Sequence, residues 1–306
     1  MTPGPAALVA PTTAAPAPDA RDRTWLRRAV LRFGADNLRP LPWRSRRDPW
    51  AVLVSEVMLQ QTQATRVAGV FEDFMERFPA ASSCARAGAG EVLVAWGGLG
   101  YNRRAVALQR AAVAVTDRFG GVVPDDLDAL CSLPGVGPYT ARAVLAFAFE
   151  RHVAVVDVNV SRVLARAVAG KALAAGAAQS LADALVPRGR SWAWNQAIME
   201  LGATRCAARA PRCGSCPLQA RCRWARAGRT GSDPARPTAR QSAFDGSDRQ
   251  GRGRLVAALR AGPVRPGQVA TACGWPDDPA RARRVADALV AEGLSRRSRG
   301  GTLVLP

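Results

Sequence analysis

Short apolar stripes with helical spacing recur along most of this chain, and glycine and proline residues separate them. The clearest stripe consists of Leu53, Val54, Val57 and Met58. Asp48 can cap this helix and Pro49 suits its first turn, so a helix is predicted to begin there. Similar patterns predict helices over residues 103–119, 125–131, 139–149, 160–169, 177–186 and 192–201. Strand patterns are few between residues 23 and 226, which predicts a mainly α domain of many short helices.

Composition divides the chain into four stretches. Residues 1–22 are rich in alanine, proline and threonine and are predicted to form a disordered tail. The helical core is expected over residues 23–226, and the composition of 227–250 is that of a linker. Residues 251–306 show three helical patterns (252–260, 264–273 and 279–292) and then a hairpin pattern around Gly300 and Gly301. This order indicates a small winged-helix-like α+β domain, and a helical cap without DNA contact is the alternative.

The charge of the chain points to a polyanionic partner. Lysine and arginine together number 43 against 24 acidic residues, which gives a formal net charge of +19. Nucleic acid is the leading partner, and an acidic membrane surface is the weaker one because no long basic amphipathic helix stands apart from the fold. Lys171 is the single lysine, a bias that genomic base composition can explain, although it does not explain the basic excess. No run of about 18 apolar residues and no secretory signal pattern is present, so we expect no membrane span and a cytoplasmic protein.

Four of the seven cysteines fall in one short stretch with the pattern C-x6-C-x2-C-x5-C. They are Cys206, Cys213, Cys216 and Cys222. Four thiolates this close converge on one centre, and the spacing favours an iron–sulfur cluster over zinc, which prefers two paired C-x2-C knuckles. Disulfides are the least favoured alternative in a chain without a secretory signal. The other cysteines, at 84, 131 and 273, are isolated and expected to be packing residues.

A glycine-rich turn precedes the predicted helix at 139–149. Gly135, Val136 and Gly137 lie in the sequence LPGVGPYT, and two glycines let a backbone approach a phosphate closely. Many such turns only separate two helices. Because this one follows the predicted helix at 125–131, it resembles the helix-hairpin-helix motif, which holds the DNA backbone without reading sequence.

Two carboxylates occur in unusually apolar surroundings. Asp157 interrupts the run HVAVVDVNV, where a helix cap is the alternative role and an anion suited to a developing cation is the functional one. Glu56 lies between Val54 and Val57, where a solvated helix face is the alternative and a proton donor with a raised pKa is the functional role.

These motifs together resemble the endonuclease III superfamily of DNA base-excision glycosylases over roughly residues 25–225. LPWR at 41–44, SEVMLQQTQ at 55–63, GLGY at 98–101 and WNQAIMELGA at 194–203 are similar to the MutY-type adenine DNA glycosylases. The resemblance implies a helix-hairpin-helix glycosylase fold, with a six-helix barrel and an iron–sulfur domain whose cysteines hold a [4Fe–4S] cluster. It further implies removal of adenine mispaired with 8-oxoguanine or guanine in duplex DNA, by a monomeric, nucleoid-associated enzyme.

The resemblance also implies residue roles. Glu56 matches the glutamate that protonates adenine N7, Asp157 matches the aspartate that stabilises the oxocarbenium-like sugar, and Asn159 supports that site. Residues matching those around the extruded adenine are Trp43, Arg44, Leu59, Gln61 and Glu200. Gln60 and Tyr101 match residues at the separated base pair.

Tyr139 separates two mechanisms within the superfamily. Bifunctional relatives carry a lysine here, whose amine attacks the sugar and leads to strand cleavage. A phenol cannot form a Schiff base, so the chain is predicted to be a monofunctional glycosylase. The alternative is that Tyr139 only packs against the hairpin.

The sequence departs from the family at three places. Asn102 replaces the second aromatic residue that many relatives place after Tyr101, and Val158 replaces a common glycine. Residues 251–306 are too short for the MutT-like domain that typical relatives append. The rival functions are a thymine or uracil mismatch glycosylase, an oxidised-pyrimidine lyase, and a non-catalytic DNA-binding protein. Glu56 within SEVMLQQTQ disfavours the first two, and the absence of a lysine at 139 further disfavours the lyase. The presence of both Glu56 and Asp157 disfavours the non-catalytic protein.

Overall fold

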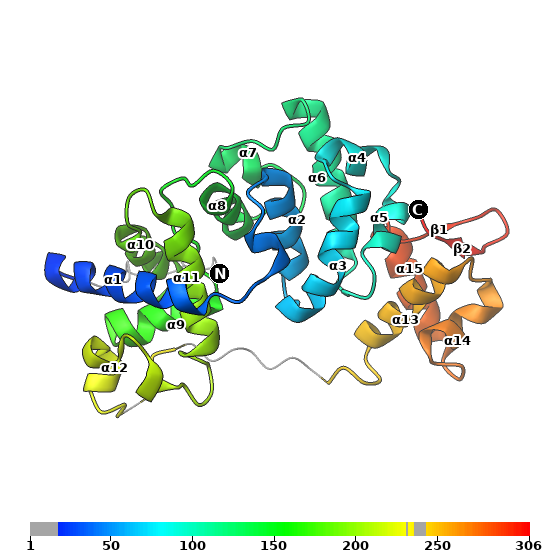
Figure 1. The fold of residues 1–306 in the computed structure, drawn as a ribbon. Coiled ribbons are helices and arrows are strands. Elements are labelled where there is room, and N and C mark those ends of the chain that lie inside the picture. Colours follow the sequence, from blue (N-terminus) through cyan, green and yellow to red (C-terminus); the bar gives the residue numbers. More distant parts are fainter. Residues whose placement is uncertain (1–17, 231, 236–242) are drawn as a thin grey trace, which may run out of the picture. The chain divides into compact units, whose positions relative to one another are not determined.

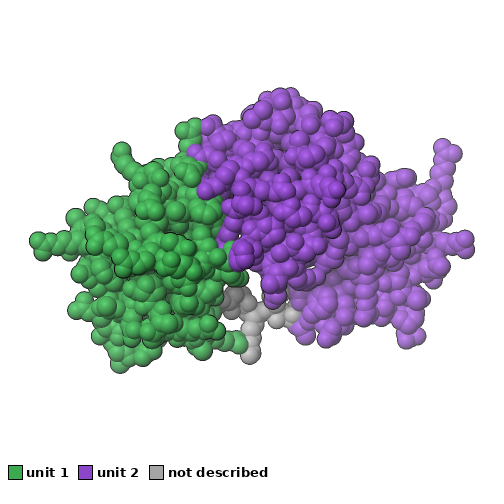
Figure 2. All heavy atoms as spheres, viewed as in Figure 1, with its two compact units in different colours: residues 1–39, 150–238 green, residues 40–149, 239–306 purple. Residues whose placement is uncertain are grey.

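The computed structural model describes residues 18–230, 232–235 and 243–306. Most of the predicted tail at 1–22 and part of the predicted linker at 227–250 therefore lie outside the described residues. The chain divides into two compact units, of which unit 1 comprises residues 1–39 and 150–238 and unit 2 comprises residues 40–149 and 239–306 (Figure 2). Each unit is thus assembled from two separate stretches of sequence.

The regular elements in the described part of unit 1 are all helices (Figure 1). It contains α1 (Ala20–Asn37), α9 (Val158–Val163), the π-helical turn η2 (Leu164–Ala169), α10 (Ala175–Leu185), α11 (Ser191–Thr204), η3 (Cys213–Ser215), η4 (Gln219–Arg221) and α12 (Arg223–Arg226). Helices α1 and α11 pack closely. Gly34 of α1 permits this approach because it has no side chain, and an added Cβ would clash with the Cβ of Ala197 in α11.

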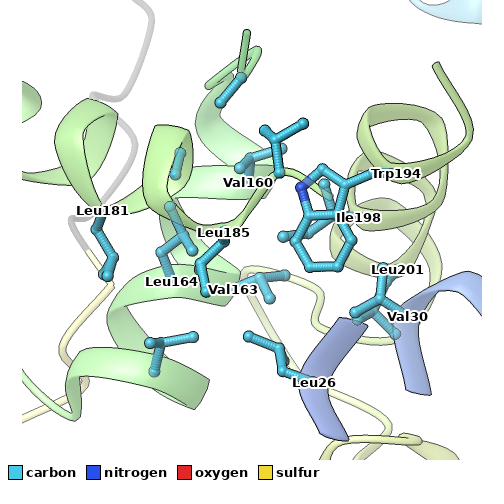
Figure 3. Packing of buried hydrophobic residues seen from close by; sticks show 14 of the residues in the cluster. Leu26, Val30, Val160, Val163, Leu164, Leu181, Leu185, Trp194, Ile198 and Leu201 are labelled. Atoms are coloured by element: carbon cyan, nitrogen blue, oxygen red, sulfur yellow. The ribbon is translucent and has the colours of Figure 1, made fainter. Parts of the chain in front are cut away.

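The core of unit 1 joins residues that are far apart in the sequence (Figure 3). Trp194 of α11 is 1% exposed and belongs to a cluster with Leu26 and Val30 of α1. The cluster also contains Val160, Val163, Leu164, Leu181, Leu185, Ile198 and Leu201. Apolar burial of this kind is the main stabilising contribution to a small helical unit.

The first stretch of unit 2 surrounds a buried helix. It contains η1 (Pro42–Arg44), α2 (Pro49–Leu59), α3 (Ala64–Arg77), α4 (Ala81–Arg86), α5 (Ala89–Ala95), α6 (Arg103–Phe119), α7 (Leu127–Cys131) and α8 (Pro138–Phe147). The side chain of Asp48 accepts a hydrogen bond from the Ala51 N–H and Pro49 occupies the first turn, which confirms the predicted start of α2. Every residue from 50 to 58 is buried, so α2 is the central helix.

The second stretch of unit 2 forms three helices and a hairpin. It contains α13 (Asp248–Ala261), η5 (Pro266–Gln268), α14 (Val269–Cys273), α15 (Pro279–Ala291), β1 (Arg296–Arg297) and β2 (Leu303–Val304). The two strands pair antiparallel, and an isolated bridge joins Val264 to Leu303. The helix α13 begins at Asp248, slightly before the predicted limit of the linker.

The predicted mainly α class is confirmed, and most predicted helices match closely. Two predicted boundaries differ from the structure. The predicted helix at 160–169 is divided into α9 and the π-helical η2, and α1 begins at Ala20, inside the predicted tail. Within the described residues, no helix is both long and apolar enough to cross a membrane.

Candidate active site and cysteine loop

Glu56 lies on α2 and is only 5% exposed. Its neighbours Val54 and Val57 are buried as well, so the solvated-face alternative does not describe this side chain. Glu56 is therefore a buried carboxyl group on a helix whose neighbouring side chains are mostly apolar.

Arg104 of α6 holds the end of α2 that follows Glu56. Its Nη1 donates to the carbonyl oxygens of Val57 at 2.7 Å and Met58 at 2.8 Å. These are C-terminal carbonyls of a helix, which lack partners within the helix itself. Burial lowers the pKa of Arg104 to about 10, and the guanidinium therefore remains charged at neutral pH.

The same arginine also reaches the loop that carries Tyr101. Its Nη2 donates to the Thr62 hydroxyl at 2.9 Å and to the Gly100 carbonyl at 3.2 Å. The guanidinium carbon lies 5.5 Å from the centre of the Tyr101 ring. Tyr101 has a positive φ of 46° and is 40% exposed, so a strained loop presents an aromatic ring to solvent. Arg104 thus connects the helix of Glu56 to this exposed ring.

The predicted hairpin joins α7 to α8. Gly135 has a φ of +76°, and a Cβ added there would meet the Ala107 Cβ at 2.8 Å, so both conformation and space require glycine. Gly137 and the buried Val136 follow, and Tyr139 is the second residue of α8. The predicted hairpin geometry is therefore present.

The end of α2 meets α8 beside this hairpin. The Gln60 amide donates to the Thr140 hydroxyl at 3.2 Å, which places Gln60 next to Tyr139 in the structure. Leu59 ends α2, and the exposed Gln61 has a positive φ of 54°. Unit 2 therefore gathers Glu56, Gln60 and the hairpin around one helix end.

Trp43 and Arg44 lie in η1, which precedes α2. Trp43 is 7% exposed and packs edge-to-face against Phe71 with a centroid distance of 5.8 Å. In the structure, Trp43 therefore packs in the core. The neighbouring Arg44 is half-buried.

Asp157 caps α9 in unit 1. Its Oδ1 accepts from the Val160 N–H at 2.7 Å, and its Oδ2 accepts from the Asn159 side-chain amide at 2.7 Å. Burial raises the pKa of Asp157, although these hydrogen bonds and the charge of Arg162 act in the opposite direction. The cap role weighed as an alternative is thus real, and it coexists with an unusual carboxylate environment.

Arg162 connects Asn159 to the start of the cysteine loop. Its Nη2 donates to Asn159 Oδ1 at 2.7 Å and to the Gly202 carbonyl at 2.8 Å, and its Nε donates to the Cys206 carbonyl at 2.6 Å. A Cβ on Gly202 would lie 2.7 Å from the Asn159 carbonyl oxygen, so α9 and α11 are in direct backbone contact. Asp157, Asn159, Arg162 and Cys206 form one continuous hydrogen-bonded series.

Glu200 lies on α11 and is 1% exposed. Arg39 donates to both of its carboxylate oxygens, at 2.5 Å and 3.3 Å. This bidentate pair gives Glu200 a structural partner that the sequence did not indicate.

The four clustered cysteines line one pocket. Cys206, Cys213, Cys216 and Cys222 surround it together with apolar residues such as Val163 and Leu201. Among the described residues, no three His, Cys, Asp or Glu side chains are close enough to hold one metal ion. Four thiol side chains around one pocket are the donor set that an iron–sulfur cluster takes.

Burial disfavours ionisation of two of the loop thiols, those of Cys216 and Cys222. Burial raises the pKa of Cys216 to about 11 and also raises the pKa of Cys222. These thiols are therefore protonated at neutral pH unless metal stabilises the thiolates.

Arg166 also lines this pocket and is 1% exposed. Its Nη1 donates to Cys206 Sγ at 3.5 Å and its Nε donates to Asp233 Oδ1 at 2.9 Å. Burial alone would lower the pKa of Arg166, and the bonds to Asp233 and to the sulfur outweigh burial and raise it. The residue is a fixed cation beside the predicted cluster ligands.

Comparison with known proteins places this geometry in a family. Residues 54–186 match the model of the HhH-GPD superfamily of base excision DNA repair proteins. The adenine DNA glycosylase of Mycobacterium tuberculosis is 46% identical over 275 residues, covering 88% of this chain and 89% of the relative. The corresponding protein of Mycolicibacterium smegmatis is 45% identical over 273 residues, covering 87% of this chain and 91% of that relative.

The chain belongs to the adenine DNA glycosylase family. Human adenine DNA glycosylase is 40% identical over 219 residues, which cover 67% of this chain and 40% of the human protein.

Solved structures support the same fold for this family member. A thermostable thymine-DNA glycosylase has a TM-score of 0.65 and 32% identity, covering 68% of this chain and all of that one. An endonuclease III in a DNA complex has a TM-score of 0.60 at 24% identity, which shows the fold alone. The helix-hairpin-helix glycosylase fold is thus confirmed.

Two departures from the family pattern have structural explanations. Val158 is the first residue of α9, is 65% exposed and has no positive φ, so the helix start accepts a β-branched residue. Asn102 precedes α6, and its Oδ1 accepts from Arg260 of α13 at 2.8 Å.

The sequence reasoning missed three arginines, namely Arg104, Arg162 and Arg166. Arg166 stands in the apolar run VLARAVA. A charged residue among apolar neighbours is the signal that identified Glu56 and Asp157. The same signal could have identified Arg166.

Proposed function

We propose that this chain is a monofunctional DNA glycosylase of base excision repair. It excises adenine mispaired with 8-oxoguanine or guanine by hydrolysing the N-glycosidic bond. The observation that carries this proposal is the buried Glu56 on α2, in a chain 46% identical to an adenine DNA glycosylase.

Glu56 acts as the general acid. The N7 atom of adenine and the glycosidic bond are shielded inside a duplex, so the base must first be extruded from the stack. Protonation of N7 by Glu56 then makes adenine a better leaving group. Trp43, Arg44, Leu59, Gln61 and Glu200 are proposed to surround the extruded base.

Asp157 stabilises the positive charge that develops on the sugar as the bond breaks. The amide of Asn159 and the N–H of Val160 hold both oxygens of the carboxylate in place. A second carboxylate that stabilises an oxocarbenium-like centre parallels the logic of retaining glycoside hydrolysis.

Tyr139 accounts for the monofunctional chemistry. Its phenol lacks the amine that would form a Schiff base with the sugar, so water completes the reaction and the strand stays intact. Lys171, the single lysine, is exposed just after Gly170 at the end of η2.

The four cysteines of the loop are proposed to bind a [4Fe–4S] cluster. Four thiolates fill the coordination positions of such a cluster, which when bound supplies a structural centre and not a reaction step. Arg166 and Arg162 tie the loop to η2 and α9 through Cys206.

The proposed partner is duplex DNA, bound by a monomer. The backbone N–H groups around Gly135, Val136 and Gly137 approach a phosphate, and Gln60 and Tyr101 lie at the separated base pair. The excess of arginine supplies the remaining attraction to the polyanion.

A panel of duplexes tests this proposal. Purified protein is incubated with A opposite 8-oxoguanine, A opposite G, T opposite G, and thymine glycol. We expect alkali-dependent cleavage at adenine in the first two duplexes and no strand nicking before alkali. Preferred excision of thymine opposite G would instead favour the activity named for the structural neighbour of 32% identity.

Three variants refine the test. Glu56→Gln and Asp157→Asn should each reduce the single-turnover excision rate by at least two orders of magnitude, the range of general acid and electrostatic contributions. Glu72→Gln is the matched control, because Glu72 is an exposed residue of α3 paired with Arg46. An undiminished rate in Glu56→Gln would refute the proposed role.

A further inference from the structure

The last stretch of unit 2 has the topology of a helix-turn-helix followed by a hairpin. Helix α14 ends at Cys273, Gly274 adopts a φ of +81°, and α15 begins at Pro279. The strands β1 and β2 follow directly, and the bridge from Val264 to Leu303 ties the hairpin to the segment before α14. In helix-turn-helix proteins the second helix lies in the DNA major groove.

The exposed side chains of α15 and of the hairpin are strongly basic. Residues 251–306 contain ten arginines and four acidic residues. Arg283 and Arg284 are exposed in the first half of α15, and Arg299 is exposed in the turn of the hairpin. The Gly301 N–H donates to the Ser298 carbonyl at 2.9 Å, which closes that turn around Arg299.

Arg281 and Arg297, by contrast, make contacts within this stretch of the chain. Arg281 stacks on Trp275 at 3.9 Å and donates to Asp248 at 2.7 Å, and Arg297 pairs with Asp287. These pairs fasten α15 to α13 and to the hairpin. The exposed arginines at 283, 284 and 299 are therefore presented on a fixed support.

This stretch is anchored to α5 and α6. Arg260 of α13 donates to the Leu93 carbonyl at 2.9 Å and to Asn102 Oδ1 at 2.8 Å. A Cβ on Gly90 would lie 2.6 Å from the Pro306 carbonyl oxygen, so the chain end packs directly on α5. Asn102 immediately follows Tyr101, so the attachment point adjoins the loop proposed to meet the separated base pair.

We propose that α15 and the β1–β2 hairpin form a second binding surface for duplex DNA. Arg283, Arg284 and Arg299 bind phosphates of the duplex beside the lesion and do not read the mispair. Guanidinium groups suit phosphate because they donate several hydrogen bonds in one plane. The surface adds affinity for undamaged duplex and does not take part in the excision chemistry. That the same duplex contacts both this surface and Tyr101 rests on the proposed function.

Salt-dependent binding tests this surface directly. The affinity of the full-length chain for an undamaged 30-base-pair duplex is measured by fluorescence anisotropy at several salt concentrations. For Arg283→Ala/Arg284→Ala we expect the slope of log K against log salt to fall by about 2, because each lost phosphate contact removes about 0.9. The Kd at fixed salt should rise roughly tenfold.

Matched variants separate this effect from a general loss of charge. Arg77→Ala/Arg86→Ala removes the same charge from exposed positions of α3 and α4 and should leave the slope near the parent value. Arg299→Ala should lower the slope by about 1. Arg283→Lys/Arg284→Lys keeps both positive charges, so its slope should stay near that of the parent. Equal slopes for the Arg283→Ala/Arg284→Ala variant and the Arg77→Ala/Arg86→Ala variant would overturn the proposal.

A second readout distinguishes this inference from the proposed function. The single-turnover excision rate at saturating enzyme should be the same for the parent and Arg283→Ala/Arg284→Ala, because the surface does not touch the reacting nucleotide. A reduced rate with unchanged duplex affinity would contradict the inference and leave the assignment of Glu56 intact.

Discussion

Arg104 donates a hydrogen bond from Nη1 to the carbonyl oxygen of Met58 at 2.8 Å. This bond joins the start of α6 to the end of the helix that carries Glu56. A carbonyl in the last turn of a helix has no partner within the helix, so a side chain from elsewhere fixes where α2 ends. The geometry of the proposed general acid therefore depends on a residue that does not touch the base.

Arg104→Ala is expected to destabilise the protein substantially. Each buried carbonyl left without a partner costs about 1–3 kcal/mol, and Arg104 serves those of both Val57 and Met58. Chemical denaturation measures the loss. Arg103→Ala is the control, because Arg103 is 73% exposed and 3.7 Å from Glu292, so its effect should stay within about 0.5 kcal/mol. Equal losses for both variants would contradict the clamp.

Gly202→Ala is expected to force α9 and α11 apart. The new methyl group would overlap the backbone of Asn159, and overpacking of this kind costs about 1–3 kcal/mol. Because Asn159 orients Asp157, the excision rate should fall as well. Gly176→Ala is the matched control, since a Cβ there meets nothing within 4 Å and should stabilise α10 by up to about 1 kcal/mol. A Gly202→Ala protein as stable as the parent would refute the close contact.

Asp157→Asn should change how stability depends on pH. Burial raises the folded-state pKa of Asp157, so the folded parent binds a proton more readily than the unfolded chain does. The free energy of unfolding contributed by this group therefore falls as pH rises from about 4, the unfolded value, to the raised pKa, and is constant above it.

The neutral amide lacks this dependence. The stability of Asp157→Asn relative to the parent should thus increase with pH across that window, which denaturation midpoints from pH 4 to pH 8 would record. A relative stability that decreases with rising pH would contradict the direction of the shift.

If the loop thiols hold the proposed [4Fe–4S] cluster, Cys216→Ser should lower the iron content of the protein by most of its amount and should also lower its thermal stability. Cys216 lines the pocket with the other three loop thiols, and a structural metal centre contributes directly to folding. Iron and sulfide content per chain and the visible absorbance of the cluster provide the measurement. Cys131→Ser is the control, because Cys131 lies on α7 and should leave the iron content unchanged. Full iron content in Cys216→Ser would exclude that thiol as a ligand.

Local sequence signals predicted the helices that end at strong boundaries. The helix predicted at 103–119 coincides with α6, since Gly120 supplies the left-handed residue that ends it. The start of α2 was predicted equally well from Asp48 as its cap. By contrast, nothing in the residues around 164–169 distinguishes the π-helical turn from an ordinary helix. The contacts of Arg166 within this turn, with Cys206 and Asp233, lie 40 and 67 positions away in the sequence.

Among the charged residues of the candidate site, those that interrupt an apolar pattern were predictable from the sequence. Glu56 and Asp157 stood out for this reason. Arg104 and Arg162 did not, because an arginine on a helix is exposed by default and its carbonyl partners come from distant segments. The pairing of Glu200 with Arg39 joins residues 161 positions apart, a relationship that no local pattern encodes.

The discontinuity of unit 1 has a consequence during synthesis on the ribosome. Helix α1 (Ala20–Asn37) packs on α11 (Ser191–Thr204), and Leu26 and Val30 are buried there. Roughly 150 residues must be translated after α1 before its partner exists, which takes roughly 8–30 s at the usual bacterial and eukaryotic rates. Throughout that interval the apolar face of α1 cannot pack against α11. The nascent chain therefore exposes a hydrophobic helix face to which chaperones can bind before the enzyme is folded.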